Sequence, residues 1–292
     1  MKKVYLYIAL LTTIFFTSCE EVVNVDLTNA KFLWSKQTGN ALGEITAIAS
    51  FDSKIIIAAG SKMYSCKDGI VYQILNESIV DAEYNITCIH IYNGRAFAGT
   101  DNGLLFTSFN GEFWSVVNSK QPLSPTLYKT IKPIISLASL GNDLYLGTSK
   151  GATSSSSVYK YDGQSIKLIK DFNSYDKVSS MCSKNFTLYV GLGGIYGSNA
   201  SAIFKYYNSE WLQTLSSNYD SVDSLVNSFT RNSVIAGFRG GHIWELSFID
   251  NVAQNWSKIY DTFADQIFNI FDDPNKKYIF ISADNGTYGY FS

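Results

Sequence analysis

The segment FAGTDNGLLFTSFNGEFWSVVN, residues 97–118, holds two Asn-Gly pairs between short apolar runs. Asn-Gly accepts positive φ at both central positions of a turn, so it favours the two-residue turn that joins antiparallel strands. Asn102-Gly103 and Asn110-Gly111 therefore predict two hairpin tips. With the apolar run before them, these tips predict a β-meander of four short strands, at 86–91, 95–100, 104–108 and 112–117.

The meander recurs along the chain. Six segments begin with Ile or Val and carry Ile, Leu or Met three residues later: ITAIAS at 45, ITCIHI at 86, IISLAS at 134, VSSMCS at 178, VDSLVN at 222 and IFNIFD at 267. Each is followed by a second predicted strand that ends on a small residue, at Ala59, Gly99, Gly147, Gly191, Gly237 and Ser282. Small residues at such positions allow a neighbouring backbone to approach closely.

These repeats predict an all-β fold, a six-bladed β-propeller over residues 31–292. The last repeat lacks a fourth strand, whereas an additional apolar segment, KFLWSKQ at 31–37, precedes the first repeat. Its Trp34 aligns with Trp114 of another fourth strand, and each is followed by serine. We expect 31–37 to complete the last blade, because a closed ring leaves no unpaired strand edge. Such a ring is expected to be monomeric.

The segments GTDNGL and FNGEFWSVV resemble the degenerate repeats of regulator-type and sialidase-type propellers. Propellers of this kind serve many functions, so the resemblance implies the fold and no particular activity. Sialidase-type propellers use three arginines against a carboxylate. This chain contains only Arg95, Arg231 and Arg239, and Arg95 opens a second strand at the opposite face. The resemblance therefore does not imply sialidase activity.

The N-terminus is a predicted signal peptide. A basic start, Met1-Lys2-Lys3, is followed by thirteen apolar residues at 4–16, too few to span a bilayer but typical of a secretory signal. The sequence FTSC that ends at Cys19 resembles the bacterial lipobox, in which the cysteine becomes the lipidated first residue of the mature protein. An ordinary signal peptide with an unrelated cysteine is the alternative.

The two acidic residues after Cys19 resemble the surface-export signal of Bacteroidota lipoproteins. We therefore expect a signal peptide at 1–18, a lipid such as palmitate on Cys19 and a tether at 19–30. The predicted location is the outer membrane, with the propeller facing outward. The lipid is the only membrane contact that we expect.

The composition excludes some classes of partner and site. The net charge of −2 gives no electrostatic basis for nucleic-acid binding. Apart from Cys19, the cysteines are Cys66, Cys88 and Cys182, an odd number within apolar strand patterns, so we expect buried thiols and no disulfide framework.

We expect no catalytic site, metal or cofactor. The G-x-S-x-G pattern at 147–151 lies in a strand-to-strand loop, whereas a nucleophile elbow leads into a helix. His90 and His242, the only histidines, lie three repeats apart. Asp223 is the only acid among the first five positions of the first strands, and Asp272 begins a predicted turn.

The long predicted loops favour a binding role. In propellers, the loops after second and fourth strands lie on one face, and binding residues concentrate on such loops. The candidate ligand-binding residues on this face are Tyr128, Lys129, Lys132, Tyr196 and Arg239. They predict a non-catalytic binding module for a protein, peptide or glycan partner. The alternative is a glycan-acting hydrolase or lyase that uses the same face.

Overall fold

A computed structural model of the protein describes residues 25–27, 30–32, 45–67, 70–73, 84–117, 132–150, 155–194, 201–218, 221–262, 265–273, 278–284 and 286–291. Every regular element within these ranges is a β-strand. Over the same ranges, no helix is long and apolar enough to cross a membrane.

Six antiparallel sheets follow one another along the chain. The first three are β3 (Ile45–Phe51), β4 (Lys54–Ala59), β5 (Lys62–Lys67) and β6 (Ile70–Gln73); β7 (Ile86–Tyr92), β8 (Arg95–Thr100), β9 (Leu105–Ser108) and β10 (Ser115–Val116); and β11 (Ile134–Leu140), β12 (Asp143–Thr148), β13 (Ser156–Tyr161) and β14 (Ile166–Phe172).

The last three sheets are β15 (Lys177–Lys184), β16 (Thr187–Gly193), β17 (Ser201–Tyr207) and β18 (Glu210–Ser217); β19 (Val222–Ser228), β20 (Ser233–Phe238), β21 (His242–Ile249) and β22 (Val252–Asp261); and β23 (Ile267–Asp273), β24 (Tyr278–Ala283) and β25 (Gly286–Phe291). The turn that we predicted to begin at Asp272 starts later in the chain, because Asp272 and Asp273 both belong to β23 and pair with β24.

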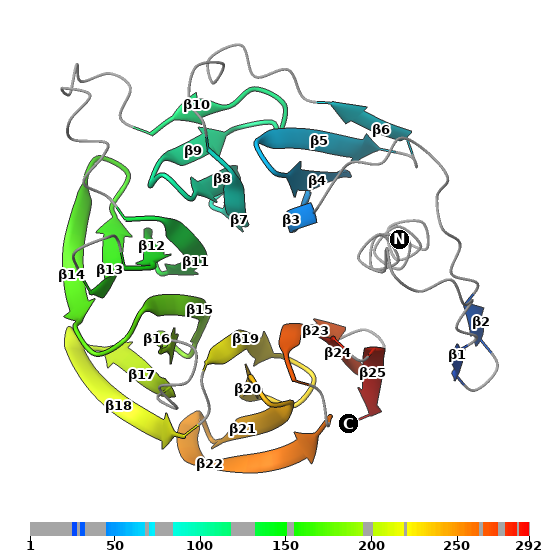
Figure 1. Ribbon diagram of the computed structural model, residues 1–292, viewed down its shortest axis with the longest axis vertical. Coiled ribbons are helices and arrows are strands. Elements are labelled where there is room, and N and C mark those ends of the chain that lie inside the picture. Colours follow the sequence, from blue (N-terminus) through cyan, green and yellow to red (C-terminus); the bar gives the residue numbers. More distant parts are fainter. Residues whose placement is uncertain are drawn as a thin grey trace.

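The sheets are arranged around a common axis, with the first strand of each sheet innermost and the last strand outermost (Figure 1). Neighbouring inner strands contact one another in chain order, from β3 through β7, β11, β15 and β19 to β23. This is the arrangement of a β-propeller, so the predicted all-β propeller fold is confirmed, and the number of six blades stays a prediction.

The predicted closing strand was wrong where the structure describes it. β2 (Ala30–Phe32) pairs with β1 (Val25–Leu27) as a separate two-stranded sheet, and the described part of the last sheet has three strands. Residues 33–37 lie outside the described ranges. Pairing with the adjacent segment closes only a two-residue loop, which costs less conformational entropy than pairing with a strand at the far end of the chain.

Close packing joins each sheet to the next. A Cβ atom on Gly99, Gly147, Gly191 or Gly237 would lie 2.5 to 2.8 Å from a methyl carbon of an aliphatic residue at the start of the next inner strand. These aliphatic residues are Ile134, Val178, Val222 and Ile267. The prediction of close approach is confirmed for the four glycines. In the first sheet the equivalent position is Ala58, opposite Ala47, and not the predicted Ala59.

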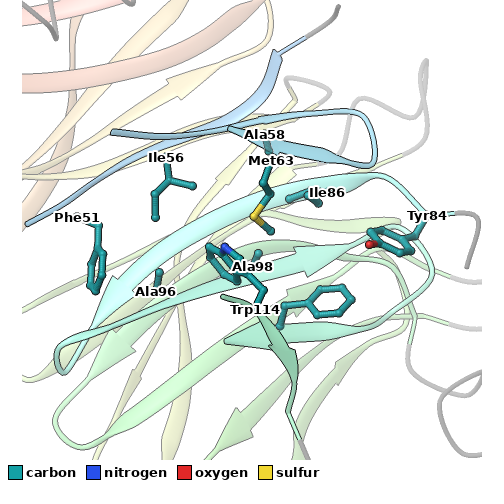
Figure 2. Close-up of a cluster of buried hydrophobic side chains, with 10 residues drawn as sticks. Phe51, Ile56, Ala58, Met63, Tyr84, Ile86, Ala96, Ala98 and Trp114 are labelled. Carbon is teal, nitrogen blue, oxygen red and sulfur yellow. The ribbon is translucent and has the colours of Figure 1, made fainter. Parts of the chain in front are cut away.

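Apolar side chains fill the spaces between sheets. Figure 2 shows the cluster between the first two sheets, where Met63 lies among side chains that include Ile86 and Trp114. The indole N–H of Trp114 donates to the carbonyl of Gly111 at 3.3 Å. Cys88 and Cys182 form no disulfide, and burial raises the pKa of each thiol to about 12. These thiols therefore stay protonated at neutral pH, as buried cysteines should.

His90 gives the fold a predicted dependence on pH. Its Nε2 atom lies 3.1 Å from Ser139 Oγ of the next inner strand, and burial lowers the pKa of His90 to about 4. The unfolded chain takes this proton near pH 6.5 and the folded chain only near pH 4. Between these values the unfolded state binds more protons, so the free energy of unfolding falls as the pH is lowered.

Urea unfolding at pH 7.5 and pH 4.5 measures this dependence in the wild type and in His90→Gln. We expect the wild type to lose on the order of 2–3 kcal/mol more than the variant, because glutamine keeps a polar group near Ser139 but does not titrate. An equal loss in both proteins would contradict the assignment.

Candidate functional site

The inner strands all begin at one end of the sheets, which we call the entry face. It contains the starts of β7, β11, β15, β19 and β23 and the ends of the second strands that pair with them. Lys132, before β11, and Arg239, after β20, both lie at this end. Tyr128, Lys129, Tyr196 and Cys19 lie outside the described residues. The grouping of the five predicted residues into one site stays a prediction.

Lys132 is held within its own sheet. Its ammonium donates to the carbonyl of Ser155 and to Ser157 Oγ, the latter at 2.6 Å, and lies 3.5 Å from Asp171 Oδ1. The Lys132 side chain is only 11% exposed. Its charge is therefore used to hold the start of β11 against β13 and β14, which is a structural role.

Arg239 belongs to a different group, the Asp223 cluster, which we define as Lys177, Asp223 and Arg239. Arg239 Nη2 lies 3.7 Å and Lys177 Nζ 4.0 Å from the same oxygen, Asp223 Oδ1. The Asp223 side chain is 5% exposed. Lys177 opens β15 of the fourth sheet, whereas Asp223 and Arg239 come from the fifth, so the cluster spans the contact between two sheets.

A bulge positions Asp223. The register of every inner strand shifts near its start, between the first and third residues of five strands and between Val178 and Ser180 of β15, so the residue in between lies at a bulge. At this position Thr87 and Ser179 donate their hydroxyls to carbonyls of the sheets, with distances of 3.0 Å to Gly99 and 3.2 Å to Gly191. An ionised carboxylate at the same position has no proton to donate. Asp223 therefore cannot replace the hydroxyl bond that its counterparts make.

Hydrogen-bonding capacity in the cluster is unused. The distances to Asp223 Oδ1 are those of ion pairs and exceed the range of good hydrogen bonds. Asp223 Oδ2 and Arg239 Nε are both buried and make no hydrogen bond of good geometry among the described residues, although the Ser221 side chain and the backbone N–H of Ile267 lie close enough to lower the pKa of Asp223. Leaving such atoms unpaired costs about 1–3 kcal/mol each. A ligand that offered both acceptors and donors would recover part of this cost.

Burial also shifts the pKa values of the cluster. It raises the pKa of Asp223, although Lys177 and Arg239 act in the opposite direction. Burial likewise lowers the pKa of Lys177, while Asp223 raises it. Two positive groups thus share one negative group in a desolvated position. The arrangement favours an additional anionic group over a cation.

The sequence identified Arg239 but did not connect it with Lys177 and Asp223. The signal that could have found Asp223 is its alignment with Thr87 and Ser179, where an acid replaces a hydroxyl. Lys177 carries no comparable signal, because a lysine before a strand is common on surfaces.

The structure also places the residues that the sequence analysis considered for catalysis and metal binding. No group of three His, Cys, Asp or Glu side chains that could hold a metal occurs within the part of the chain that the structure describes. His90 lies in β7, and His242, whose Nδ1 lies 3.1 Å from Asp261 Oδ1, lies in β21. Ser149 of the G-x-S-x-G pattern forms a β-bridge with Lys177, so its surroundings are those of paired strands.

No family model and no curated protein sequence matches this chain. Solved structures with a similar fold include YCF48 from Cyanidioschyzon merolae, at a TM-score of 0.60 and 11% identity, over 85% of this chain and 82% of that chain. YCF48 bound to D1 peptide gives 0.59 and 14%, over 85% and 78%. A chain of the nidogen/laminin complex gives 0.56 and 9%, over 82% and 89%. At these identities, the likeness shows the β-propeller fold alone.

Proposed function

We propose that the protein is a non-catalytic binding module that captures a protein or peptide partner on the entry face. The observation that carries the proposal is the Asp223 cluster at the contact of two sheets, in which one buried donor, Arg239 Nε, and one buried acceptor, Asp223 Oδ2, make no hydrogen bond of good geometry among the described residues. The likeness to YCF48, solved with D1 peptide, and to a chain of the nidogen/laminin complex supports a binding role, because those propellers hold macromolecular partners.

The ligand group that this cluster fits is an acidic side chain of the partner. A guanidinium accepts a carboxylate in a bidentate geometry, and the Lys177 ammonium supplies a second positive charge beside it. Asp223 Oδ2 remains an acceptor for a main-chain N–H of the same segment. A neutral glycan would leave the positive charge of the cluster unpaired, so we favour an acidic peptide segment.

We also propose that the protein is a lipoprotein of the cell envelope. The lipobox-like FTSC, the apolar run before it and the two acidic residues after Cys19 support this proposal. Residues 1–18 are then removed on export, the lipid on Cys19 anchors the chain, and residues 19–30 tether the propeller to the outer membrane. In this location the entry face is available to partners outside the membrane.

Replacement of Arg239 tests the binding proposal. An array of immobilised peptides is prepared in matched pairs, with Asp or Glu in one member and Asn or Gln in the other. We expect wild type to prefer the acidic members and Arg239→Ala to lose about tenfold or more of that affinity, since a hydrogen bond to a charged group contributes about 1.5–3 kcal/mol. Arg95→Ala is the matched control, because Arg95 opens β8 at the end of the sheets opposite the entry face and lies over the Phe109 ring. An equal loss in both variants, or no preference for acidic peptides, would contradict the proposal.

Replacement of Cys19 tests the anchor separately. Labelled palmitate should enter the wild-type chain, and the protein should sediment with membranes. Cys19→Ala should take up no label and shift to the soluble fraction, because no other lipid site is proposed. Wild type that remains unlabelled beside a labelled control lipoprotein would refute the anchor and leave the binding proposal untouched.

A further inference from the structure

A cavity of about 410 Å³ lies at the end of the sheets opposite the entry face. It is lined by the turns and strand ends of the third, fourth and fifth sheets, and its walls include Lys184, Asn227, Asn232, Phe186 and Phe229. Its volume falls within the roughly 300–1,000 Å³ of small-ligand pockets. It therefore suits one or two residues of a peptide.

Lys184 supplies a positive charge to this cavity. It is the last residue of β15 and is 7% exposed. Its ammonium donates to Asn227 Oδ1 at 3.1 Å and lies 5.9 Å from the centre of the Phe229 ring. An ammonium has three donors, and among the described residues this one donates to a single neutral acceptor and lies 5.4 Å from the centre of the Phe248 ring.

Burial lowers the pKa of Lys184 and the charge of Asp272 raises it, but the two side chains form no ion pair within the part of the chain that the structure describes. Asp272 of β23 directs its Oδ2 atom to the backbone N–H groups of Phe229 and Thr230, at 2.7 and 3.1 Å. Asp272 is absent from the cavity wall. Its role is to fix the turn that carries Phe229, so an anion that enters the cavity meets Lys184 first.

Phe186 is held in a costly conformation at the rim. It has φ of +58° in the turn between β15 and β16 and is 86% exposed. The matching position in the second sheet is Gly94, with φ of +67°. A bulky side chain at positive φ is strained, and here no burial offsets the strain. Such a residue is retained where its side chain has a use.

Phe229 completes the rim from the neighbouring sheet and is 73% exposed. Single exposed apolar residues are common on protein surfaces. Two aromatic side chains on adjacent turns, one of them strained, beside a cavity with a buried ammonium are a different case. The arrangement combines an apolar contact surface with the positive charge of Lys184.

We propose that this cavity binds the C-terminus of a partner protein, with the terminal carboxylate on Lys184 and an apolar last side chain between Phe186 and Phe229. The asparagine amides of the wall are partly used, because Asn227 Oδ1 accepts from Lys184 and Asn232 Nδ2 donates to the carbonyl of Phe248 at 3.2 Å. An uncharged sugar would leave the positive charge of Lys184 without a counter-ion, so we favour a carboxylate. This site is independent of the Asp223 cluster and of the acidic segment proposed there.

Fluorescence polarisation with two labelled tetrapeptides, Gly-Gly-Ser-Phe as the free acid and as the C-terminal amide, tests the proposal on the full chain. We expect wild type to bind the acid about tenfold more tightly than the amide. Lys184→Gln should abolish that preference. Lys167→Gln, on the outer strand β14 and outside both proposed sites, is the control and should leave it unchanged. Equal binding of acid and amide by wild type would overturn the proposal.

Phe186→Gly provides a second variant that does not endanger the fold. Glycine adopts positive φ without strain, so the urea concentration at the midpoint of unfolding should rise. Binding of both peptides should weaken about tenfold, because the aromatic side chain is lost. Unchanged binding would overturn the proposed rim. An oligosaccharide array probed with the same variants gives the competing outcome, because sugar binding that is lost in Lys184→Gln would assign the cavity to a glycan and refute a C-terminal peptide.

Discussion

The structure depends on how closely the second strand of one sheet approaches the first residue of the next inner strand. At Gly147 and Gly191 an added Cβ atom would lie only 2.5 and 2.6 Å from a valine methyl carbon, which is closer than two non-bonded carbon atoms can approach. The absence of a side chain therefore sets the spacing between sheets. Apolar clusters such as that around Met63 fill the space that remains beside these contacts.

This spacing places polar groups of adjacent sheets beside one another at both ends of β15. At the entry face, Lys177 of the fourth sheet meets Asp223 of the fifth across the contact between Gly191 and Val222. At the opposite face, Lys184 meets Asn227 across the same pair of sheets. The two lysines are seven residues apart on one strand, roughly 23 Å at about 3.3 Å per residue. One contact between sheets thus positions both proposed binding sites.

The fold was predictable because its signals are local and repeated. A recurring apolar first strand and a small residue near the end of the second strand predicted the meanders and their order. The turn type predicted from the Asn-Gly pairs was wrong, because Gly103 and Gly111 have positive φ but Asn102 and Asn110 do not. The sites were less predictable because they join residues from different repeats. Arg239 was found from its loop, but its neighbours Lys177 and Asp223 come from two other strands. Phe186 carried no sequence signal, because its positive φ is visible only in the structure. At residues 31 and 32 the predicted closing strand was wrong, because its pattern permits both a local hairpin and a distant pairing, whereas the pairing of residues 33–37 stays a prediction.

The central claim, that the contact at Gly191 positions the Asp223 cluster, can be tested by comparing Gly191→Ala with Gly99→Ala. Both added Cβ atoms meet an aliphatic side chain at 2.5–2.6 Å, so both should destabilise the fold to a similar extent, by about 1–3 kcal/mol. Only Gly191→Ala displaces Val222, the neighbour of Asp223 in the chain. The measurement is the affinity of each folded variant for an acidic peptide that binds wild type. The account predicts a loss of at least fivefold in Gly191→Ala and wild-type affinity in Gly99→Ala, whereas equal affinities in the two variants would contradict it.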